Sequence, residues 1–232
     1  MKRASDTCLR IALLGAESTG KSVLAQDLSQ ALAEATGLRC VWLPEYLRQW
    51  CEEHSRTPRP EEQAGIAATH AAQIEAAAQT CDVLICDTTP LMTAVYSQHL
   101  FQDDSLLPEA LRLQRGFDLN LLTALDLPWV ADGLQRDGPQ VRAPVDAAVR
   151  RALMQGGLAW SVVAGLEGAR LEAALNAITP LLLKRQQAPS AATGLFTGLE
   201  ERQKKRQAQL PSWTWVCEKC DVPECEHQGL RR

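Results

Sequence analysis

The sequence predicts an α/β fold: a mostly parallel, five-stranded sheet with helices on both faces. Short apolar runs alternate with longer segments of helical pattern, which is typical of strand–helix–strand units around a parallel sheet. The runs are mostly continuous in apolar residues, as expected for strands that are covered on both faces. The predicted strands are residues 9–14, 40–43, 82–86, 119–125 and 160–163.

Segments of helical pattern separate these runs. The segment 61–80 is rich in alanine, the residue with the highest helix propensity. Pro90 falls in the first turn of its predicted helix, where proline is tolerated. The predicted helices are residues 22–35, a piece that starts at 49–51 and is cut by Pro58 and Pro60, and residues 61–80, 88–101 and 166–183.

Length and charge narrow the class of protein. The chain has 232 residues and a formal net charge of -4 at pH 7, which gives no general attraction to nucleic acids or anionic lipids. It has no apolar run long enough to span a membrane, and its first residues lack the apolar core of a signal peptide. We therefore expect a cytoplasmic protein with reduced cysteines that pack as small apolar side chains. These are Cys8, Cys40, Cys51, Cys81 and Cys86.

The first predicted strand and helix are joined by GAESTGKS at residues 15–22, which fits the phosphate-binding pattern G-x-x-x-x-G-K-[ST]. Glycines allow a turn that directs main-chain N–H groups at one anion, and the following helix adds its positive dipole end. In this pattern Lys21 binds the outer phosphates and Ser22 binds Mg²⁺. The sequence therefore predicts nucleoside triphosphate binding, with ATP preferred because the chain lacks an N-K-x-D guanine motif. The loop residues expected to bind the nucleotide are Gly15, Glu17, Ser18, Thr19, Gly20, Lys21, Ser22 and Val23.

Asp87 directly follows the third predicted strand. Because the carboxyl ends of parallel strands meet at one edge of a sheet, Asp87 is expected beside the phosphate-binding loop. A carboxylate there can hold the Mg²⁺ shell while Ser22 binds the ion directly. The alternative is that Asp87 caps the next helix at Thr88, a role compatible with the first.

The sequence Glu45-Tyr46-Leu47-Arg48 follows the second predicted strand and is expected at the same edge. Glu45 can accept the proton of an attacking hydroxyl. Arg48 can hold a phosphate or pair with Glu45, and Tyr46 or Trp50 can stack on an aromatic acceptor. The alternative is a surface ion pair, with Tyr46 packed among apolar side chains.

Residues 129–142 lie between the fourth and fifth predicted strands and combine turn residues with Arg136 and Arg142. A mobile segment of this kind can close on the phosphates, neutralise the transferred group and exclude water. The alternative is an ordinary loop with solvated arginines.

The composition changes after Lys184 to one rich in Gln, Ala, Gly and charged residues. We expect a nucleotide-binding, kinase-like domain at 1–184 and a C-terminal arm at 185–232. Four side chains in the arm suit tetrahedral zinc in a small knuckle: Cys217, Cys220, Cys225 and His227. The alternatives are that these cysteines bind nothing or form a redox pair, and His54 is another source for the fourth ligand.

Four segments, in this order, resemble the NadR-type P-loop family of AAA/ATPase-like proteins, which includes the ribosylnicotinamide kinase domain of NadR. The segments are GAESTGKS at 15–22, EYLR at 45–48, CDTTPLMTAVYS at 86–97 and FDLNLLTALDLPWVADGLQRDGPQVR at 117–142. The order and spacing agree over about residues 9–183. The chain departs from NadR in two ways: it has no H-x-G-H-like motif of an adenylyltransferase, and it has Thr89 where NadR tends to have an acidic residue.

The resemblance implies a P-loop kinase fold and Mg²⁺-dependent transfer of the ATP γ-phosphate to the 5′-hydroxyl of nicotinamide riboside, a step of NAD biosynthesis. By this similarity Lys21 and Ser22 serve the phosphates and Mg²⁺, and Arg136 and Arg142 belong to a lid. The residues expected to act in catalysis are Lys21, Glu45, Asp87 and Arg136. The residues expected to contact the acceptor are Glu45, Tyr46, Arg48, Asp87 and Thr88.

An alternative function is an ATP-binding regulator or scaffold that hydrolyses ATP slowly and recruits a partner through its tail. Glu45, Arg48 and the arginine-bearing segment 129–142 favour the kinase. The cysteine-bearing tail favours the regulator.

Overall fold

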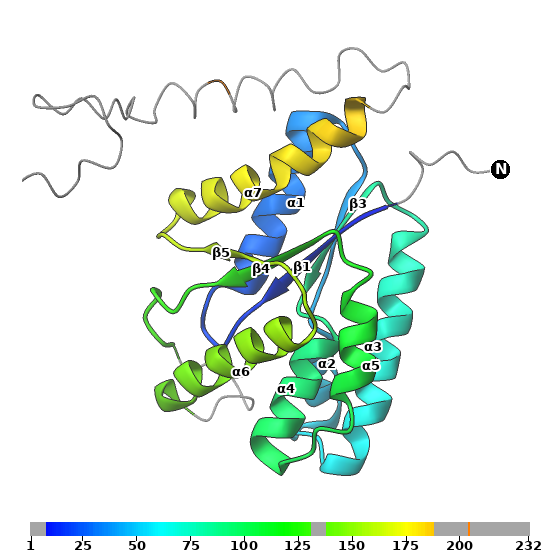
Figure 1. Ribbon diagram of the computed structural model, residues 1–232, viewed down its shortest axis with the longest axis vertical. Helices are drawn as coiled ribbons and strands as arrows, with labels where there is room; N and C mark the ends of the chain where they lie inside the picture. The colour runs from blue at the N-terminus through cyan, green and yellow to red at the C-terminus, as the bar shows by residue number, and fades with distance from the viewer. Residues whose placement is uncertain (1–7, 131–137, 188–203, 205–232) are drawn as a thin grey trace, which may run out of the picture.

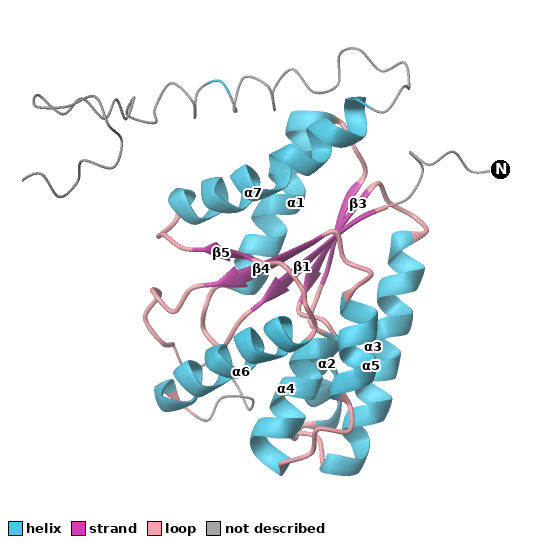
Figure 2. Cartoon of the chain, in the orientation of Figure 1, coloured by secondary structure: helices cyan, strands magenta, loops and turns pink. Residues whose placement is uncertain are grey.

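The sequence predicts a mostly parallel, five-stranded sheet, and in the structure every described pair of strands is parallel. The computed structural model describes residues 8–130, 138–187 and 204. Its strands pair in the order β2-β3-β1-β4-β5, every pair parallel. They are β1 (Leu9–Leu14), β2 (Cys40–Leu43), β3 (Val83–Asp87), β4 (Leu119–Thr123) and β5 (Ser161–Val163). Helices cover both faces of the sheet (Figures 1 and 2).

The helices form two layers around the sheet (Figure 1). On one face lie α1 (Lys21–Thr36) and α7 (Gly168–Gln187). On the other lie α3 (Gln63–Ala78), α4 (Pro90–Phe101), α5 (Leu107–Gln114) and α6 (Arg142–Gln155). Helix α2 (Tyr46–His54) packs against α3, and single 3-10 turns at Pro60–Glu62 and Pro139–Val141 precede α3 and α6.

Alternate residues of β1 belong to the two cores on either side of the sheet. Leu9, Ile11 and Leu13 pack with α1 and α7, whereas Ala12 and Leu14 pack with α4, α5 and α6. A shift of one residue would exchange these faces, so burial on both sides fixes the register of β1. The position at which the chain leaves β1, after Leu14, is thereby fixed as well.

Two helices, α5 and α6, lie in segments for which the sequence does not predict a helix. In α6 the buried side chains Val145, Val149 and Leu153 recur every four residues, which is the spacing of one helix face. That pattern starts directly after the turn-rich segment 129–142 and was obscured by it. Four predicted helix starts also move by two or three residues: α2 begins at Tyr46, α3 at Gln63, α4 at Pro90 and α7 at Gly168.

The cysteines in the described part of the chain are all free thiols. Cys51, Cys81 and Cys86 are buried as predicted, whereas Cys8 and Cys40 are half-buried. Burial raises the pKa of the Cys40 thiol to about 12, so this thiol stays protonated at neutral pH.

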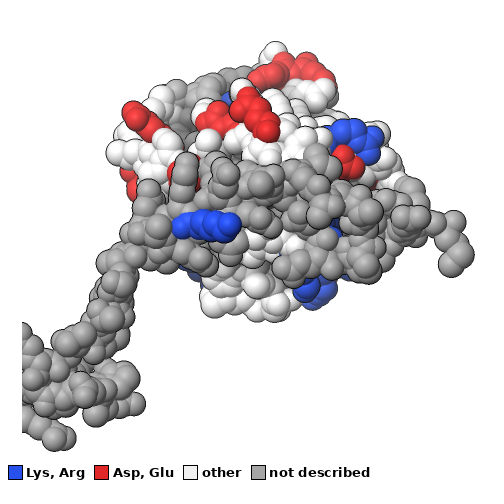
Figure 3. Space-filling view, turned by 90° about the horizontal axis from the view of Figure 1, so that it is seen from above, with Lys and Arg blue, Asp and Glu red and all other residues white. Residues whose placement is uncertain are grey.

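No helix in the described ranges combines the length and the hydropathy that a membrane span requires. Figure 3, which views the molecule from the top of Figure 1, shows acidic side chains gathered toward one edge of this face and basic ones in separate small groups. Helix α7 continues past residue 184 to Gln187. The rest of the predicted arm, apart from Lys204, lies outside the described residues, so the division into two parts stays a prediction.

Candidate phosphate-binding site

The loop of residues 15–20 joins β1 to α1, as predicted for the phosphate-binding pattern. Gly15 has φ 143° and Gly20 has φ 74°, and both values lie in the region that favours glycine. Gly20 is the N-cap of α1, so the first N–H groups of this helix, which lack partners within the helix, face the loop.

Thr123, the last residue of β4, holds the loop from the side. A Cβ on Gly15 would lie 2.2 Å from Thr123 Oγ1, so only glycine fits there. Thr123 Oγ1 lies 3.1 Å from Leu14 O and 2.7 Å from Thr19 Oγ1, and the Thr19 hydroxyl donates to Ala16 O at 2.8 Å. Sequence reasoning missed Thr123, because only the pairing of β4 with β1 brings it to the loop.

The structure brings Ser22 and Asp87 together. Ser22 Oγ donates to Asp87 Oδ2 at 2.5 Å, because Asp87 ends β3 opposite Leu13 of β1. Asp87 is only 1% exposed, and its Oδ1 has no hydrogen-bond partner in the described part of the chain. A buried carboxylate oxygen without a partner is costly unless a ligand satisfies it. Lys21 lies in the same loop, where its Nζ donates to Ala16 O at 2.8 Å.

The alternative interpretation of Asp87 as a helix cap is wrong. The N-cap of α4 is Thr89, and Asp87 belongs to β3. Between them Thr88 has φ 67°, a left-handed conformation that is strained for a β-branched residue. Its N–H donates to Leu13 O at 3.1 Å, which ties this turn to the strand that leads into the phosphate-binding loop.

Thr89 is held by a chain of buried hydrogen bonds. Its hydroxyl donates to Gln114 Oε1 at 2.7 Å, and Gln114 Nε2 donates to Asn120 Oδ1 at 2.7 Å. Asn120 Nδ2 in turn donates to Ala159 O at 2.9 Å. At the position where NadR tends to have an acidic residue, this chain therefore carries a hydroxyl that is engaged in the interior.

The predicted acceptor residues follow β2, the neighbour of β3 in the sheet. Glu45 is the N-cap of α2 with an extended backbone, and Tyr46 is the first residue of that helix. Glu45, Tyr46 and Arg48 are each half-buried. Leu43 and Cys86 are paired across the two strands, so the segments that begin at Glu45 and Asp87 leave the sheet at the same edge.

Helix α3 places a histidine next to this segment. The rings of Tyr46 and His70 have centroids 6.5 Å apart. His70 is 2% exposed, and its Nε2 has no hydrogen-bond partner within the described residues. Burial lowers the pKa of His70 to about 4, so its imidazole is neutral at pH 7. The sequence pattern that could have predicted a buried histidine is its position between Ile66 and Ile74, four residues from each, on the buried face of α3.

Acid is expected to destabilise the wild-type protein more than a His70→Gln variant. The pKa of His70 lies at about 4 in the folded protein, below its ordinary value of 6.5. Between these two pH values the imidazole of His70 is protonated in the unfolded chain but not in the folded protein. The free energy of unfolding therefore decreases as the pH falls. From pH 7 to pH 5 we expect the free energy of unfolding to fall by about 2 kcal/mol more in the wild type. Urea denaturation followed by circular dichroism measures this difference, and equal losses in both proteins would contradict it.

Of the two arginines predicted to belong to a lid, the structure describes only Arg142. Arg136 lies outside the described residues. Arg142 is the first residue of α6 and is 8% exposed, so the interpretation of it as a solvated arginine is wrong. Its Nη1 donates to Leu127 O at 2.9 Å, whereas Nε and Nη2 have no partner among the described residues. The Leu127 side chain in turn reaches the loop, because a Cβ on Gly20 would lie 2.9 Å from Leu127 Cδ1.

Ser18 and Val130 join the phosphate-binding loop to the segment 129–142. Ser18 Oγ donates to Val130 O at 2.8 Å and accepts from Val130 N at 3.3 Å. Of the other loop residues predicted to bind the nucleotide, Glu17 is buried and Val23 is 64% exposed.

The predicted zinc ligands Cys217, Cys220, Cys225 and His227 lie outside the described residues. His54, the other source considered for the fourth ligand, lies on α2 with its Nδ1 2.8 Å from Trp50 O and its ring stacked on that of Trp50 at 3.9 Å. Within the described ranges, no group of three or more His, Cys, Asp or Glu side chains is placed to hold a metal ion.

P-loop proteins are defined by a phosphate-binding loop that joins a buried strand to a helix, with a carboxylate from the adjacent strand next to the serine of the loop. This chain has each of these features and is assigned to that class. The sequence matches the family model AAA_28, described as an AAA domain, over residues 10–169. This match spans more than half of the chain, and the protein therefore belongs to that family. No curated protein matches the sequence.

Solved structures share this fold. A crystal structure of NadR protein in complex with NAD and AMP-PNP aligns with a TM-score of 0.58 and 17% identity, covering 75% of this chain and 49% of NadR. NadR in complex with NR gives a TM-score of 0.60 and 17% identity, with coverage of 75% and 50%. The chain thus spans about half the length of NadR. Thymidylate kinase from Candida albicans aligns with a TM-score of 0.50 and 16% identity, covering 77% of this chain and 94% of that enzyme.

Proposed function

We propose that this protein is an ATP-dependent small-molecule kinase that transfers the γ-phosphate to the 5′-hydroxyl of a nucleoside-like acceptor, with nicotinamide riboside as that acceptor. The observation that carries the proposal is the contact between Ser22 and the buried Asp87 beside the phosphate-binding loop. The likeness of the fold to a thymidylate kinase and to NadR, which binds NR and AMP-PNP in its structures, supports the same class of reaction.

The residues at this edge of the sheet fit Mg²⁺. Ser22 Oγ and the Asp87 carboxylate are oxygen donors of the kind that Mg²⁺ prefers, and Asp87 Oδ1 lacks a partner in the described part of the chain. Ser22 and Asp87 would hold the ion, directly or through its water shell. When bound, Mg²⁺ would neutralise charge on the phosphates of ATP.

The chain itself supplies the remaining phosphate contacts in this proposal. Main-chain N–H groups of residues 15–22 bind the phosphates, and Lys21 adds an ammonium at the outer ones. Arg142 has two guanidinium nitrogens without described partners, and they would donate to the transferred group. Arg136 is assigned to the same role by the resemblance alone. In such a reaction the protein acts mainly by positioning and by charge.

The acceptor would enter between the ends of β2 and β3. Glu45 would accept the proton of the attacking hydroxyl, while Tyr46, Arg48 and Thr88 contact the remainder of the molecule. The neutral His70 beside Tyr46 can donate or accept a hydrogen bond without adding a positive charge, which suits nicotinamide riboside, because its pyridinium ring is itself cationic.

Product detection by mass spectrometry tests the proposal. The protein is incubated with Mg·ATP and, separately, with nicotinamide riboside, the common nucleosides and their monophosphates. We expect a product heavier by one phosphoryl group from nicotinamide riboside, and none when EDTA removes Mg²⁺. Slow formation of ADP with no phosphorylated product would favour the regulator or scaffold instead.

The proposal for the tail is a structural zinc ion held by Cys217, Cys220, Cys225 and His227. Metal analysis of the purified full chain is expected to give about one equivalent of zinc, which should be lost when Cys217 and Cys220 are replaced with serine. Less than about one tenth of an equivalent in the wild type would end this proposal.

A further inference from the structure

Arg170 on α7 joins three segments that come together at the carboxyl edge of the sheet. Its side chain is buried, with the residue 5% exposed. Nε donates to Gly165 O at 3.0 Å, Nη1 donates to Thr19 O at 2.9 Å, and Nη2 donates to the Asp126 carboxylate. Asp126 Oδ2 in turn accepts from Gly165 N at 2.6 Å. We call Arg170, Asp126, Gly165 and Thr19 the Arg170 clamp.

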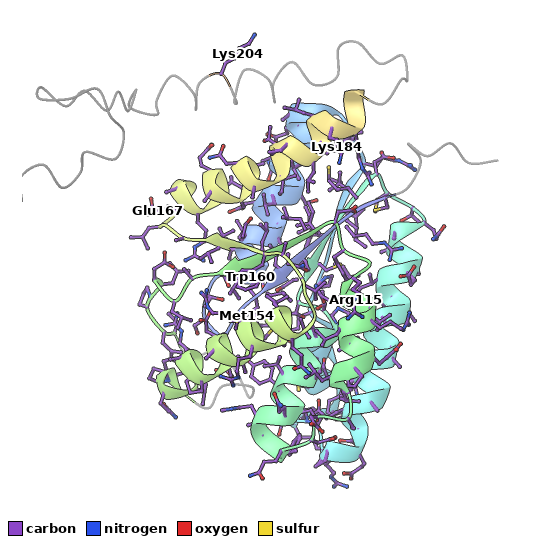
Figure 4. All side chains as sticks on the ribbon, in the orientation of Figure 1. Arg115, Met154, Trp160, Glu167, Lys184 and Lys204 are labelled. Carbon is purple, nitrogen blue, oxygen red and sulfur yellow. The ribbon has the colours of Figure 1, made fainter. Side chains whose placement is uncertain are left out.

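The clamp connects loops that follow three neighbouring strands. Thr19 lies after β1, Asp126 after β4 and Gly165 after β5, and these strands are adjacent in the sheet. Figure 4 labels Glu167, which lies in the connection between β5 and α7 just before Arg170. The contact between Arg170 and Thr19 therefore ties the start of α7 to the phosphate-binding loop.

The charge of the buried guanidinium is balanced within the clamp. Burial acts to raise the pKa of Asp126, but the Gly165 N–H and the Arg170 cation outweigh it and lower the pKa. Asp126 is thus ionised at neutral pH and pairs with Arg170. Arg170 is buried, but the Asp126 side chain is 33% exposed, and an ion pair that is partly solvated adds little stability, so its use lies in the geometry that it fixes.

That geometry concerns the peptide unit between Thr19 and Gly20. In a trans peptide the carbonyl oxygen and the amide hydrogen point in opposite directions, and no cis peptide is present in the described residues. Because Arg170 holds the Thr19 carbonyl on one side, the Gly20 N–H is directed to the other. The Thr19 side chain is held independently by Ala16 O and Thr123 Oγ1, so this peptide unit has little freedom to rotate.

We propose that Arg170 is a positioning residue for triphosphate binding, which directs the Gly20 N–H toward the phosphates by holding the Thr19 carbonyl. Asp126 orients Arg170 for this contact. The identity of the ligand rests on the proposed function. The clamp residues follow β1, β4 and β5, whereas the proposed acceptor residues follow β2 and β3 on the other side of the sheet order, so the clamp sets the affinity for nucleotide and leaves the affinity for acceptor unchanged.

Nucleotide binding by Arg170→Lys and Asp126→Asn variants tests this inference. We expect the Kd for a non-hydrolysable Mg·ATP analogue to rise by about 10- to 100-fold in Arg170→Lys, because one ammonium cannot replace a planar guanidinium that binds three acceptors. Asp126→Asn should weaken binding by a smaller factor, and the KM for the acceptor should stay constant in both. Arg10→Lys is the matched control, because it alters a two-point pair with Glu75 near the opposite end of β1.

Isothermal titration gives the Kd, and circular dichroism melts show whether each variant is folded. Where Arg170→Lys does not fold, Asp126→Asn carries the test. A variant that melts at a lower temperature, yet binds the analogue as tightly as wild type when folded, would reduce the clamp to a structural role and overturn the inference. Absence of binding in the wild type would instead overturn the proposed function, and with it the ligand assigned to the clamp.

In the nucleotide-free protein, the NMR shift of the Gly20 amide should change in Arg170→Lys but not in Arg10→Lys.

Discussion

A Lys21→Ala variant is expected to lose phosphoryl transfer by about three orders of magnitude or more. Lys21 lies in the phosphate-binding loop with its Nζ 2.8 Å from Ala16 O, so its ammonium is held close to the loop amides. Its charge would offset the negative charge that spreads over the transferred group, and alanine has no charge to do so. The measurement is kcat with the acceptor identified by mass spectrometry, together with the Kd for Mg·ATP.

The control for this variant is Lys184→Ala. Lys184 is an exposed lysine in the last turns of α7 (Figure 4), so its loss removes the same charge from the chain without altering the loop. Transfer by Lys21→Ala within tenfold of wild type would show that the loop does not act on the phosphates as proposed.

A Glu45→Gln variant is expected to bind Mg·ATP normally and to turn over about 10² to 10⁴ times more slowly, which is the usual worth of a general base. Glutamine keeps the size of the side chain and its place as N-cap of α2, but it does not accept the proton of the attacking hydroxyl. The expected signature is therefore a fall in kcat with an unchanged KM for ATP.

Glu53→Gln serves as the control for this second variant, because Glu53 lies at the exposed side of the same helix, where it accepts from Gln49 Nε2. Normal turnover in Glu45→Gln would mean that another group takes the proton, or that the acceptor hydroxyl reacts without a base. The two variants together separate phosphate binding from activation of the acceptor.

The parts of this molecule that the sequence predicts well are those whose chemistry is local. The phosphate-binding loop is one continuous motif, and its glycines have the positive φ values that the motif requires. Asp87 was placed beside Ser22 from the rule that parallel strands end at one edge, and the two side chains are in contact. The run of β1, which is apolar except for Arg10, likewise indicates a strand that is buried on both faces.

The parts that the sequence did not predict depend on contacts between distant residues. Arg170 and Thr19 are 151 positions apart, and the acceptor is a main-chain carbonyl, which no residue type encodes. Thr123 reaches Gly15 only through the pairing of β4 with β1. Helix α6 differs from these cases, because Val145, Val149 and Leu153 gave a local signal that the turn-rich segment before it concealed.

Calorimetric titration of ATP into the purified protein, with Mg²⁺ and then with EDTA, tests the central claim most directly. That claim is that residues 15–22 and Asp87 form a site for Mg·ATP. We predict one site per chain, weaker binding when Mg²⁺ is removed, and loss of this Mg²⁺ dependence in Asp87→Asn. A folded wild-type protein that does not bind ATP, or that binds it equally with and without Mg²⁺, would contradict the claim.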